Sequence, residues 1–286
     1  MINIGFIGLG IMGGPMASHL INNGYALSVF NRSKAKSEKW STKNKKAKVC
    51  WSIKDIALNS DIIILCVGND YDVKQIIDEV VTFIKPGTVV IDHTTTSAKL
   101  AKEMNQMLVE KESHFLDAPV SGGEAGAQHG TLSVMIGGDN EIYLSIKELL
   151  GSYSKFTKYM GPSGHGQLTK MVNQICIAGL IQSLAEGLHF SKKAGLEAND
   201  VIEVISKGAA QSWQMDNRWK SMTEDYYDHG FAVDLMRKDL DIVIDHAKII
   251  DANLEITELV NSFYKNIQDN GGGRWDTSSL LKRLQS

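Results

Sequence analysis

Three glycines close to the N-terminus constrain the fold of this chain more than any other feature. Gly8, Gly10 and Gly13 follow the largely apolar run at residues 2–7 and lead into a segment with helical spacing at residues 12–23, in which Gly13 is the second residue. In such a strand-to-helix junction, one glycine permits a tight turn, one admits a pyrophosphate close to the backbone, and one allows close packing of helix on strand. A plain turn is the alternative, but the flanking strand and helix favour a dinucleotide-binding βαβ unit. The residues expected to contact the dinucleotide are Gly8, Leu9, Gly10, Ile11, Met12 and Gly13.

Short segments rich in Ile and Val recur through the first half of the chain and alternate with helical patterns. They are apolar on both faces, which is typical of parallel strands buried between two layers of helices. The repeated alternation of strand and helix predicts an α/β fold with a doubly wound, mostly parallel sheet of the Rossmann type. The segments lie within residues 2–10, 26–31, 61–67, 88–93, 113–120 and 131–138.

Beyond residue 160 the strand pattern ends and long helical periodicities continue to the C-terminus. Residues 167–193 carry apolar side chains over so broad a surface that we expect a helix buried on most sides. At 286 residues, the chain is long enough for two domains. We predict a dinucleotide-binding Rossmann domain at 1–162 and an all-α domain for substrate binding and oligomerisation at 163–286.

The composition excludes several other classes of protein. A formal net charge of -3 gives no reason to expect nucleic acid or an anionic membrane as a partner. No segment reaches the roughly 20 apolar residues of a membrane span, and the N-terminus lacks the basic region of a signal peptide. Cys50, Cys66 and Cys176 match no metal-binding or redox spacing and have apolar neighbours, so we expect them to be buried. These features predict a cytoplasmic protein without a metal site.

The end of the second expected strand bears on the choice of dinucleotide. A site that prefers NAD usually places Asp or Glu there, about 20 residues after the glycine motif, to bind the ribose 2′-hydroxyl. This chain has Asn31, Arg32 and Ser33 instead, and its next carboxylate is Glu38. Arg32 can pair with a 2′-phosphate, and Asn31 can donate hydrogen bonds without repelling it. A solvated basic helix start is the alternative. We therefore predict NADP as the preferred cofactor, with NAD as the second candidate.

A run of small residues follows another expected strand end. Ser121, Gly122 and Gly123 offer one hydroxyl and several backbone N–H groups at the carboxyl edge of the sheet, where ligands of such folds bind. That arrangement suits a carboxylate group. An ordinary glycine-rich turn is the alternative, and the sequence by itself does not separate the two.

Lys170 and Asn173 lie three residues apart on one expected helix, so they share a face. The surrounding residues are apolar, and desolvation would lower the pKa of such a lysine and allow proton transfer near neutral pH. A lysine that extends from an amphipathic helix into solvent is the competing interpretation. Further along, Lys238 and Asp239 would by themselves be an ordinary charge pair on a helix surface.

Together these segments resemble the β-hydroxyacid dehydrogenase family, which includes 3-hydroxyisobutyrate dehydrogenases, tartronate semialdehyde reductases and reductases of glyoxylate or succinic semialdehyde. The resemblance covers almost the whole chain and implies a Rossmann domain followed by a helical domain like the C-terminal part of 6-phosphogluconate dehydrogenase. It also implies a small carboxylate substrate and a homodimer or homotetramer. The motifs that carry it lie at 4–17, 92–97, 117–138, 161–174 and 236–240.

The resemblance implies a role for each matching residue. Lys170 gives a proton to the carbonyl oxygen during reduction and removes it during oxidation, and Asn173 holds the substrate hydroxyl or carboxylate beside it. Ser121, Gly122 and Gly123 bind the substrate carboxylate. The implied activity is the NAD(P)-dependent interconversion of a small β-hydroxyacid and its semialdehyde.

Further matching residues are implied to contact the cofactor or to support the lysine. Thr95 and Val67 lie in segments beside the cofactor, and Lys238 reaches it. Phe231 sits near the nicotinamide end, and Asp239 supports the catalytic lysine.

Three departures from the family pattern leave the substrate open. Gln174 stands where a second Asn is frequent, Thr94 replaces a Ser, and residues 66–69 replace a turn of the Leu-Pro type. A 6-phosphogluconate dehydrogenase would carry a much larger helical domain, and imine reductases usually replace the lysine. A non-catalytic dinucleotide-binding module is the remaining alternative, and the intact Lys170 and Asn173 weigh against it.

Overall fold

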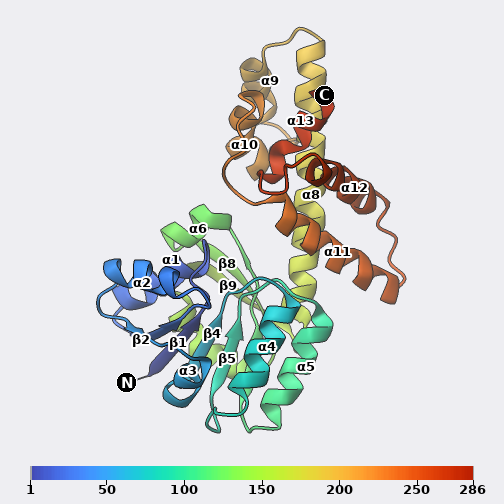
Figure 1. Cartoon of the computed structure of the whole chain (residues 1–286). Coiled ribbons are helices and arrows are strands. Elements are labelled where there is room, and N and C mark those ends of the chain that lie inside the picture. Colours follow the sequence, from blue (N-terminus) through green and yellow to red (C-terminus); the bar gives the residue numbers. More distant parts are fainter. Residues whose placement is uncertain (1, 286) are drawn as a thin grey trace. The chain divides into compact units, whose positions relative to one another are not determined.

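The computed structural model describes residues 2–285, and the chain divides into two compact units between Lys170 and Met171. The division falls within the long helix α8 (His165–Lys193), labelled in Figure 1. The first unit contains a nine-stranded sheet, and the second is built from helices.

The sheet of the first unit has the strand order β3-β2-β1-β4-β5-β6-β8-β7, with β9 paired to β8. The pairings from β3 to β6 are parallel, whereas β8 runs antiparallel to β6 and β7. The predicted doubly wound, mostly parallel sheet is therefore confirmed. Its strands are β1 (Asn3–Ile7), β2 (Ala26–Phe30), β3 (Lys48–Val49), β4 (Ile62–Leu65), β5 (Val89–Asp92), β6 (His114–Asp117), β7 (Val120–Ser121), β8 (Leu132–Gly137) and β9 (Ser154–Gly161).

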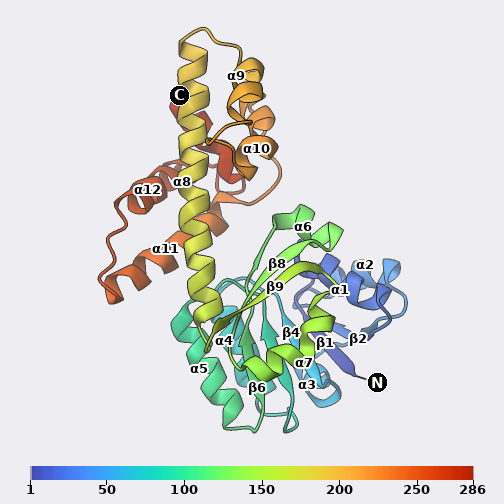
Figure 2. The same ribbon diagram turned by 180° about the vertical axis from the view of Figure 1, so that it is seen from behind.

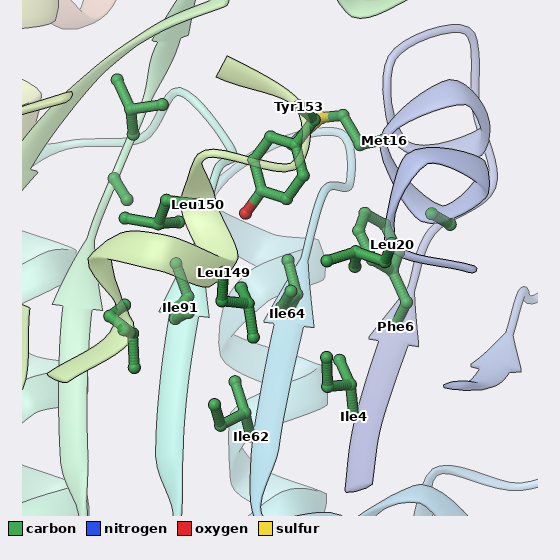
Figure 3. Packing of buried hydrophobic residues seen from close by; sticks show 14 of the residues in the cluster. Ile4, Phe6, Met16, Leu20, Ile62, Ile64, Ile91, Leu149, Leu150 and Tyr153 are labelled. Atoms are coloured by element: carbon green, nitrogen blue, oxygen red, sulfur yellow. The ribbon is translucent and has the colours of Figure 1, made fainter. Parts of the chain in front are cut away.

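Helices cover both faces of this sheet, as Figures 1 and 2 show from opposite sides. Because side chains alternate along a strand, β4 sends Ile62 and Ile64 to one core and Ile63 and Leu65 to the other. The first core includes α1 and α7, and Figure 3 shows its packing. The helices are α1 (Gly13–Asn22), α2 (Lys34–Lys43), α3 (Ile53–Asn59), α4 (Asp70–Val80), α5 (Ala98–Val109), α6 (Gly123–His129) and α7 (Asn140–Leu150).

Two strands of the sheet have no counterpart among the predicted ones. Strand β3 is only two residues long, and β9 pairs only with β8 among the described strands. Most of β9 is exposed or half-buried, and it carries Lys155 and Lys158. The predicted strands are apolar runs of the kind that is buried on both faces, and an edge strand does not need such a run.

The second unit confirms the predicted all-helical region. Within residues 171–285 the only β pairing is an isolated bridge between Ala232 and Asp276. Its core gathers buried side chains such as Ile181, Met236 and Tyr264. After α8, its elements are α9 (Ala198–Ile205), α10 (Trp213–Thr223), α11 (Val233–Ile249), α12 (Glu255–Asp269), a 3₁₀ turn (Thr277–Ser279) and α13 (Leu280–Gln285).

Two expectations about burial were wrong. Helix α8 is not buried on most sides in the isolated chain, because Leu180 is 45% exposed and Phe190 is 71% exposed. Cys176 is also exposed and Cys66 is only partly buried, whereas Cys50 is buried as expected. Apolar neighbours in sequence do not reveal which side of a helix faces the core.

No helix formed by residues 2–285 combines the length and apolarity needed to cross a membrane.

Candidate active site

The glycine turn joins β1 to α1 in a conformation that only small residues allow. Gly8 has a φ of +103°, and a Cβ there would lie 2.1 Å from the carbonyl oxygen of Cys66. A Cβ on Gly13 would lie 2.0 Å from the carbonyl oxygen of Gly8, so this glycine lets α1 pack on the turn. At Gly10, by contrast, a Cβ would meet no atom within 4 Å.

Helix α1 begins three residues after Gly10, and its N-terminus has no side-chain cap. Its N-cap residue, Met12, makes no capping hydrogen bond, and neighbouring Ile11 is 58% exposed. Uncapped N–H groups at a helix N-terminus form a site for an anion such as a pyrophosphate. The residues present therefore fit a dinucleotide at the turn.

At the end of β2, Asn31 makes hydrogen bonds to the backbone, and Arg32 is an exposed cation. The Asn31 Oδ1 accepts from the backbone N–H of Leu9 at 3.0 Å, and its Nδ2 donates to the carbonyl of Ser33 at 3.2 Å. Arg32 is 86% exposed at its side chain, and its Nη1 lies 3.2 Å from the Asp72 Oδ1. Asn31 thus fixes the loop, while Arg32 remains the group that can reach a ligand.

Asp72 is a charged neighbour of this region that the sequence analysis did not single out. It lies in the first turn of α4, where its backbone N–H donates to the side chain of Asn69. A polar cap after the apolar β4 was a visible sign of a helix start. The pairing with Arg32 was not visible, because the two residues are 40 positions apart.

The loops that follow β4 and β5 are joined at the carboxyl edge of the sheet. The Val67 N–H donates to the Thr94 Oγ1 at 3.0 Å, and the Thr94 N–H donates to the Asp92 Oδ1 at 2.9 Å. Thr95 follows directly and is half-buried. Burial raises the pKa of Asp92 to about 7, although the hydrogen bonds from Thr94 oppose this shift.

Asp117, at the end of β6, anchors the start of α8. One carboxylate oxygen accepts from the Gly164 N–H at 2.7 Å, and the other accepts from the Gln167 N–H at 2.9 Å. Burial raises the pKa of Asp117, while hydrogen bonds from these backbone N–H groups act in the opposite direction. A carboxylate at a helix N-terminus also complements the helix dipole.

Gln167 ties the same helix turn to the loop after β5. Its Nε2 donates to the carbonyl of Thr94 at 2.8 Å, and its Oε1 accepts from the Thr96 N–H at 3.1 Å. Lys170 lies one turn further along α8, and its side chain is buried. Asp117 and Gln167 therefore hold the first turn of α8, and the sequence analysis assigned no role to either residue. An acidic residue at the end of an apolar strand was the available signal.

Glycine also brings α8 close to the sheet. A Cβ on Gly166 would lie 2.5 Å from the carbonyl oxygen of Asp117 and 2.6 Å from that of Met135. Only glycine lets the helix begin at this distance from β6 and β8.

The small-residue loop lies between β7 and α6. Ser121 ends β7 and is half-buried, and Gly122 and Gly123 have φ values of +130° and +62°. Both glycines are exposed. Their left-handed conformations turn the backbone sharply after the strand, which favours glycine at both positions.

In the second unit, a chain of polar contacts joins α8 to α11. The Gln174 Nε2 donates to the Asp239 Oδ2 at 2.6 Å, and the Asn173 Nδ2 donates to the Gln174 Oε1 at 2.7 Å. The Lys238 Nζ lies 3.1 Å from the Asp239 Oδ1. Asp239 and Gln174 are both buried. Three predicted site residues, Asn173, Lys238 and Asp239, are thus brought together by Gln174.

Phe231 lies just before α11, and its backbone is held on both sides. Its N–H donates to the Asp276 Oδ2 at 2.8 Å, and its carbonyl accepts from the Thr277 N–H at 2.9 Å. The Arg218 Nε lies 3.3 Å from the Asp276 Oδ1. Asp276 is buried, so this ion pair fixes the segment that carries Phe231.

The sequence matches two family models that follow one another along the chain. Residues 3–161 match the model of the NAD-binding domain of 6-phosphogluconate dehydrogenase. Residues 164–284 match the model described as NAD-binding of NADP-dependent 3-hydroxyisobutyrate dehydrogenase.

Curated relatives and a solved structure align with the chain over nearly its full length. An uncharacterized oxidoreductase from Shewanella frigidimarina is 50% identical over 288 residues, which cover 100% of this chain and 99% of the relative. The 2-hydroxy-3-oxopropionate reductase of Escherichia coli is 32% identical, with 99% and 97% covered. The structure of 3-hydroxyisobutyrate dehydrogenase from Mycobacterium tuberculosis with L-serine gives a TM-score of 0.92 at 25% identity, with 100% of both chains covered.

Proposed function

The chain belongs to the β-hydroxyacid dehydrogenase family of NAD-binding oxidoreductases, and we propose that it interconverts a small β-hydroxyacid and the corresponding semialdehyde. The observation that carries this proposal is the position of Lys170 on α8. The helix is held at the carboxyl edge of the sheet by Asp117 and Gln167. The E. coli relative and the M. tuberculosis protein are both named for small hydroxylated or oxidised carboxylic acids, which supports this substrate class.

Lys170 is the proposed general acid and base. A bound reduced nicotinamide supplies the hydride that reaches the carbonyl carbon. Lys170 donates a proton to the oxygen of that carbonyl during reduction and takes it back during oxidation. General acid catalysis of this kind contributes about 10²- to 10⁴-fold to the rate.

The other proposed site residues bind and orient the ligands. Backbone N–H groups of Gly122 and Gly123, with the hydroxyl of Ser121, hold the substrate carboxylate. Asn173 hydrogen-bonds the substrate near its reacting carbon, and the pair Lys238 and Asp239 supports the cofactor and the catalytic lysine.

The proposed cofactor preference is NADP over NAD. Arg32 is the exposed cation at the end of β2, and no carboxylate occupies residues 31–33 to bind a free 2′-hydroxyl. Thr95 and Val67, in the joined loops after β5 and β4, and Phe231 complete the proposed contacts to the dinucleotide.

We also propose that the protein works as a homodimer or homotetramer. The second unit exposes apolar side chains on several helices, with Phe190 at 71%, Ile249 at 74% and Ile256 at 66%. Exposed apolar surface of this kind marks interaction sites. Light scattering coupled to size-exclusion chromatography would measure the mass, and a monomer would contradict this assembly.

A panel of small hydroxyacids and semialdehydes, assayed with both NAD(H) and NADP(H), tests the proposed reaction. We expect a change in nicotinamide absorbance that depends on the acid and is faster with NADP(H). A protein that binds the dinucleotide but turns over no member of the panel would contradict the proposal and favour a non-catalytic binding module.

A further inference from the structure

We propose that three exposed lysines at the far end of α2 and just beyond it accelerate the association of the anionic dinucleotide through their electric field, without touching the bound cofactor. The inference rests on the dinucleotide site of the proposed function. It concerns the rate at which either dinucleotide reaches that site, and not the choice between NADP and NAD.

The positive charge of the first unit is concentrated in one stretch of the chain. Residues 32–54, the basic segment, contain nine Lys or Arg and one acidic residue, Glu38. The rest of the first unit contains nine Lys or Arg and fifteen Asp or Glu. The basic segment therefore has a formal charge of +8, against -6 for the remainder of the unit. The small net charge of the whole chain hides this separation.

The lysines of the basic segment are all exposed. Within residues 2–285, the only ion pair that the segment forms is that of Arg32 with Asp72. Lys36, Lys39 and Lys43 are three and four residues apart, so they line one face of α2. Like charges at this spacing destabilise a helix, and the only buried residue of α2 is Ser37. Packing therefore does not explain this row of lysines.

The basic segment begins beside the glycine turn and then leads away from it. Asn31, directly before the segment, accepts from the Leu9 N–H at 3.0 Å. Helix α2 connects β2 to β3 and is labelled in Figure 1. With a rise of about 1.5 Å per residue, Lys43 lies about 14 Å along the helix from its start, and Lys45 and Lys46 follow the helix end. These three residues, the distal lysines, are too far from the end of β2 to hydrogen-bond a phosphate there.

The field of the distal lysines extends further than a hydrogen bond. The pyrophosphate makes both dinucleotides anionic, and the 2′-phosphate adds more negative charge to NADPH. The Debye length is about 10 Å at 0.1 M salt and about 20 Å at 20 mM salt. At low salt the distal lysines therefore attract the ligand and oppose the repulsion from the negative remainder of the unit. Charge of one sign around a site can raise association rates about 10- to 10³-fold.

Stopped-flow fluorescence of NADPH binding to the full-length protein tests the inference at about 20 mM and about 0.5 M salt. We expect the association rate constant of the wild type to fall at least about tenfold between the two conditions. A variant with Lys43→Gln, Lys45→Gln and Lys46→Gln should associate about threefold more slowly than the wild type at 20 mM salt and equally fast at 0.5 M. Its dissociation rate constant should stay within about 1.5-fold, because charges outside the contact act mainly on the encounter.

Two further measurements separate the field from other effects. NADH should respond in the same direction but by a smaller factor, because it lacks the 2′-phosphate. Glu in place of Gln at the three distal positions doubles the change in charge, so association of NADPH should slow about ninefold at 20 mM salt.

The matched control removes the same charge elsewhere in the first unit. Lys85→Gln, Lys111→Gln and Lys147→Gln, combined in one variant, replace three exposed lysines that lie outside the basic segment. This variant should keep the wild-type association rate within about 1.5-fold at 20 mM salt. Circular dichroism verifies that each variant is folded.

Several results would overturn the inference. Association at low salt that is unchanged in both distal variants would show that their field does not act on the ligand. An equal loss in the control would assign the effect to net charge instead of the basic segment. Faster dissociation at an unchanged association rate would indicate a direct contact with the bound dinucleotide. A wild type that binds neither dinucleotide would contradict the proposed function itself, which separates the two failures.

Discussion

Asp117 in the first unit and Asp239 in the second are both buried carboxylates, yet they are held by different kinds of partner. Asp117 accepts from backbone N–H groups at the first turn of α8. Asp239 contacts the side chains of Lys238 and Gln174. The backbone contacts determine where a helix begins, and the side-chain contacts determine which atoms an amide presents. We therefore expect Asp117 to govern the rate through Lys170, and Asp239 to govern substrate preference through Asn173.

Lys170→Ala should have the largest effect. The variant lacks the proposed proton donor, so turnover should fall by about 10²- to 10⁴-fold or more, while NADPH affinity stays within about twofold of wild type. Steady-state kinetics and fluorescence titration with NADPH measure the two quantities. Near-normal turnover would show that Lys170 is not the proton donor. It would also contradict the proposal that Asp117 affects the rate by positioning Lys170.

Asp117→Asn should have the next largest effect. An Asn side chain can accept one of the two backbone N–H groups, but its NH₂ group would then face the other donor. We expect kcat to fall by about 10²-fold through misplacement of Lys170, with a lower melting temperature. Asp139→Ala is the control, since Asp139 also caps a helix of the first unit, at α7. It should cost about 1 kcal/mol of stability without a change in kcat. An equal loss of kcat in both variants would show that Asp117 affects kcat only through the stability of the fold.

Asp239→Asn should act mainly on substrate affinity. An Asn at this position can turn either its oxygen or its NH₂ group toward Gln174, so the Asn173 amide loses its fixed orientation. We expect KM for the acid to rise about tenfold, with kcat reduced less than in Asp117→Asn. If Asp239→Asn lowered kcat as strongly as Asp117→Asn at constant KM, the proposed difference between the two carboxylates would be wrong.

Asp92 is a third buried carboxylate, and its ionisation should make the stability of the protein depend on pH. Burial raises its pKa from about 3.8 to about 7, so the folded state favours its protonated form. This contribution to stability is complete below about pH 4 and is lost as the pH rises through 7. Asp92→Asn cannot ionise, so its stability relative to wild type should increase by about 2 to 3 kcal/mol between pH 5 and pH 8. Urea unfolding at both pH values measures this, and a constant difference would show that Asp92 does not titrate there.

Asp72→Asn should have the smallest effect. Removal of a negative charge beside Arg32 should strengthen binding of NADPH about threefold and leave NADH unchanged, because only NADPH carries the 2′-phosphate. Asp78→Asn, also on α4 but paired with Lys74, is the control. Equal effects on both dinucleotides would indicate that Arg32 does not contact the 2′-phosphate.

The features that the sequence predicted are local in the chain. The turn at Gly8–Gly13 and the apolar strands could be predicted because their signals lie within a few neighbouring residues. The partners of Asp117 and Gln167 are 47 to 73 positions away, so no local pattern revealed that these residues position α8. Gln174 was recognised only as a departure from the family pattern, because its contact with Asp239 spans 65 positions. The exposure of Cys176 depends on the side of α8 that faces the core, which its apolar neighbours do not specify.

The proposed hydride transfer can be followed directly with deuterium. NADPH carrying deuterium at the transferable position of the nicotinamide is mixed with the semialdehyde that turns over fastest, and the product acid is analysed by mass spectrometry and proton NMR. We expect one deuterium on the carbon that bears the new hydroxyl group, in the wild type but not in Lys170→Ala over the same time. A hydroxyacid product without deuterium at that carbon, or a consumed semialdehyde that yields no hydroxyacid, would contradict the proposed reaction.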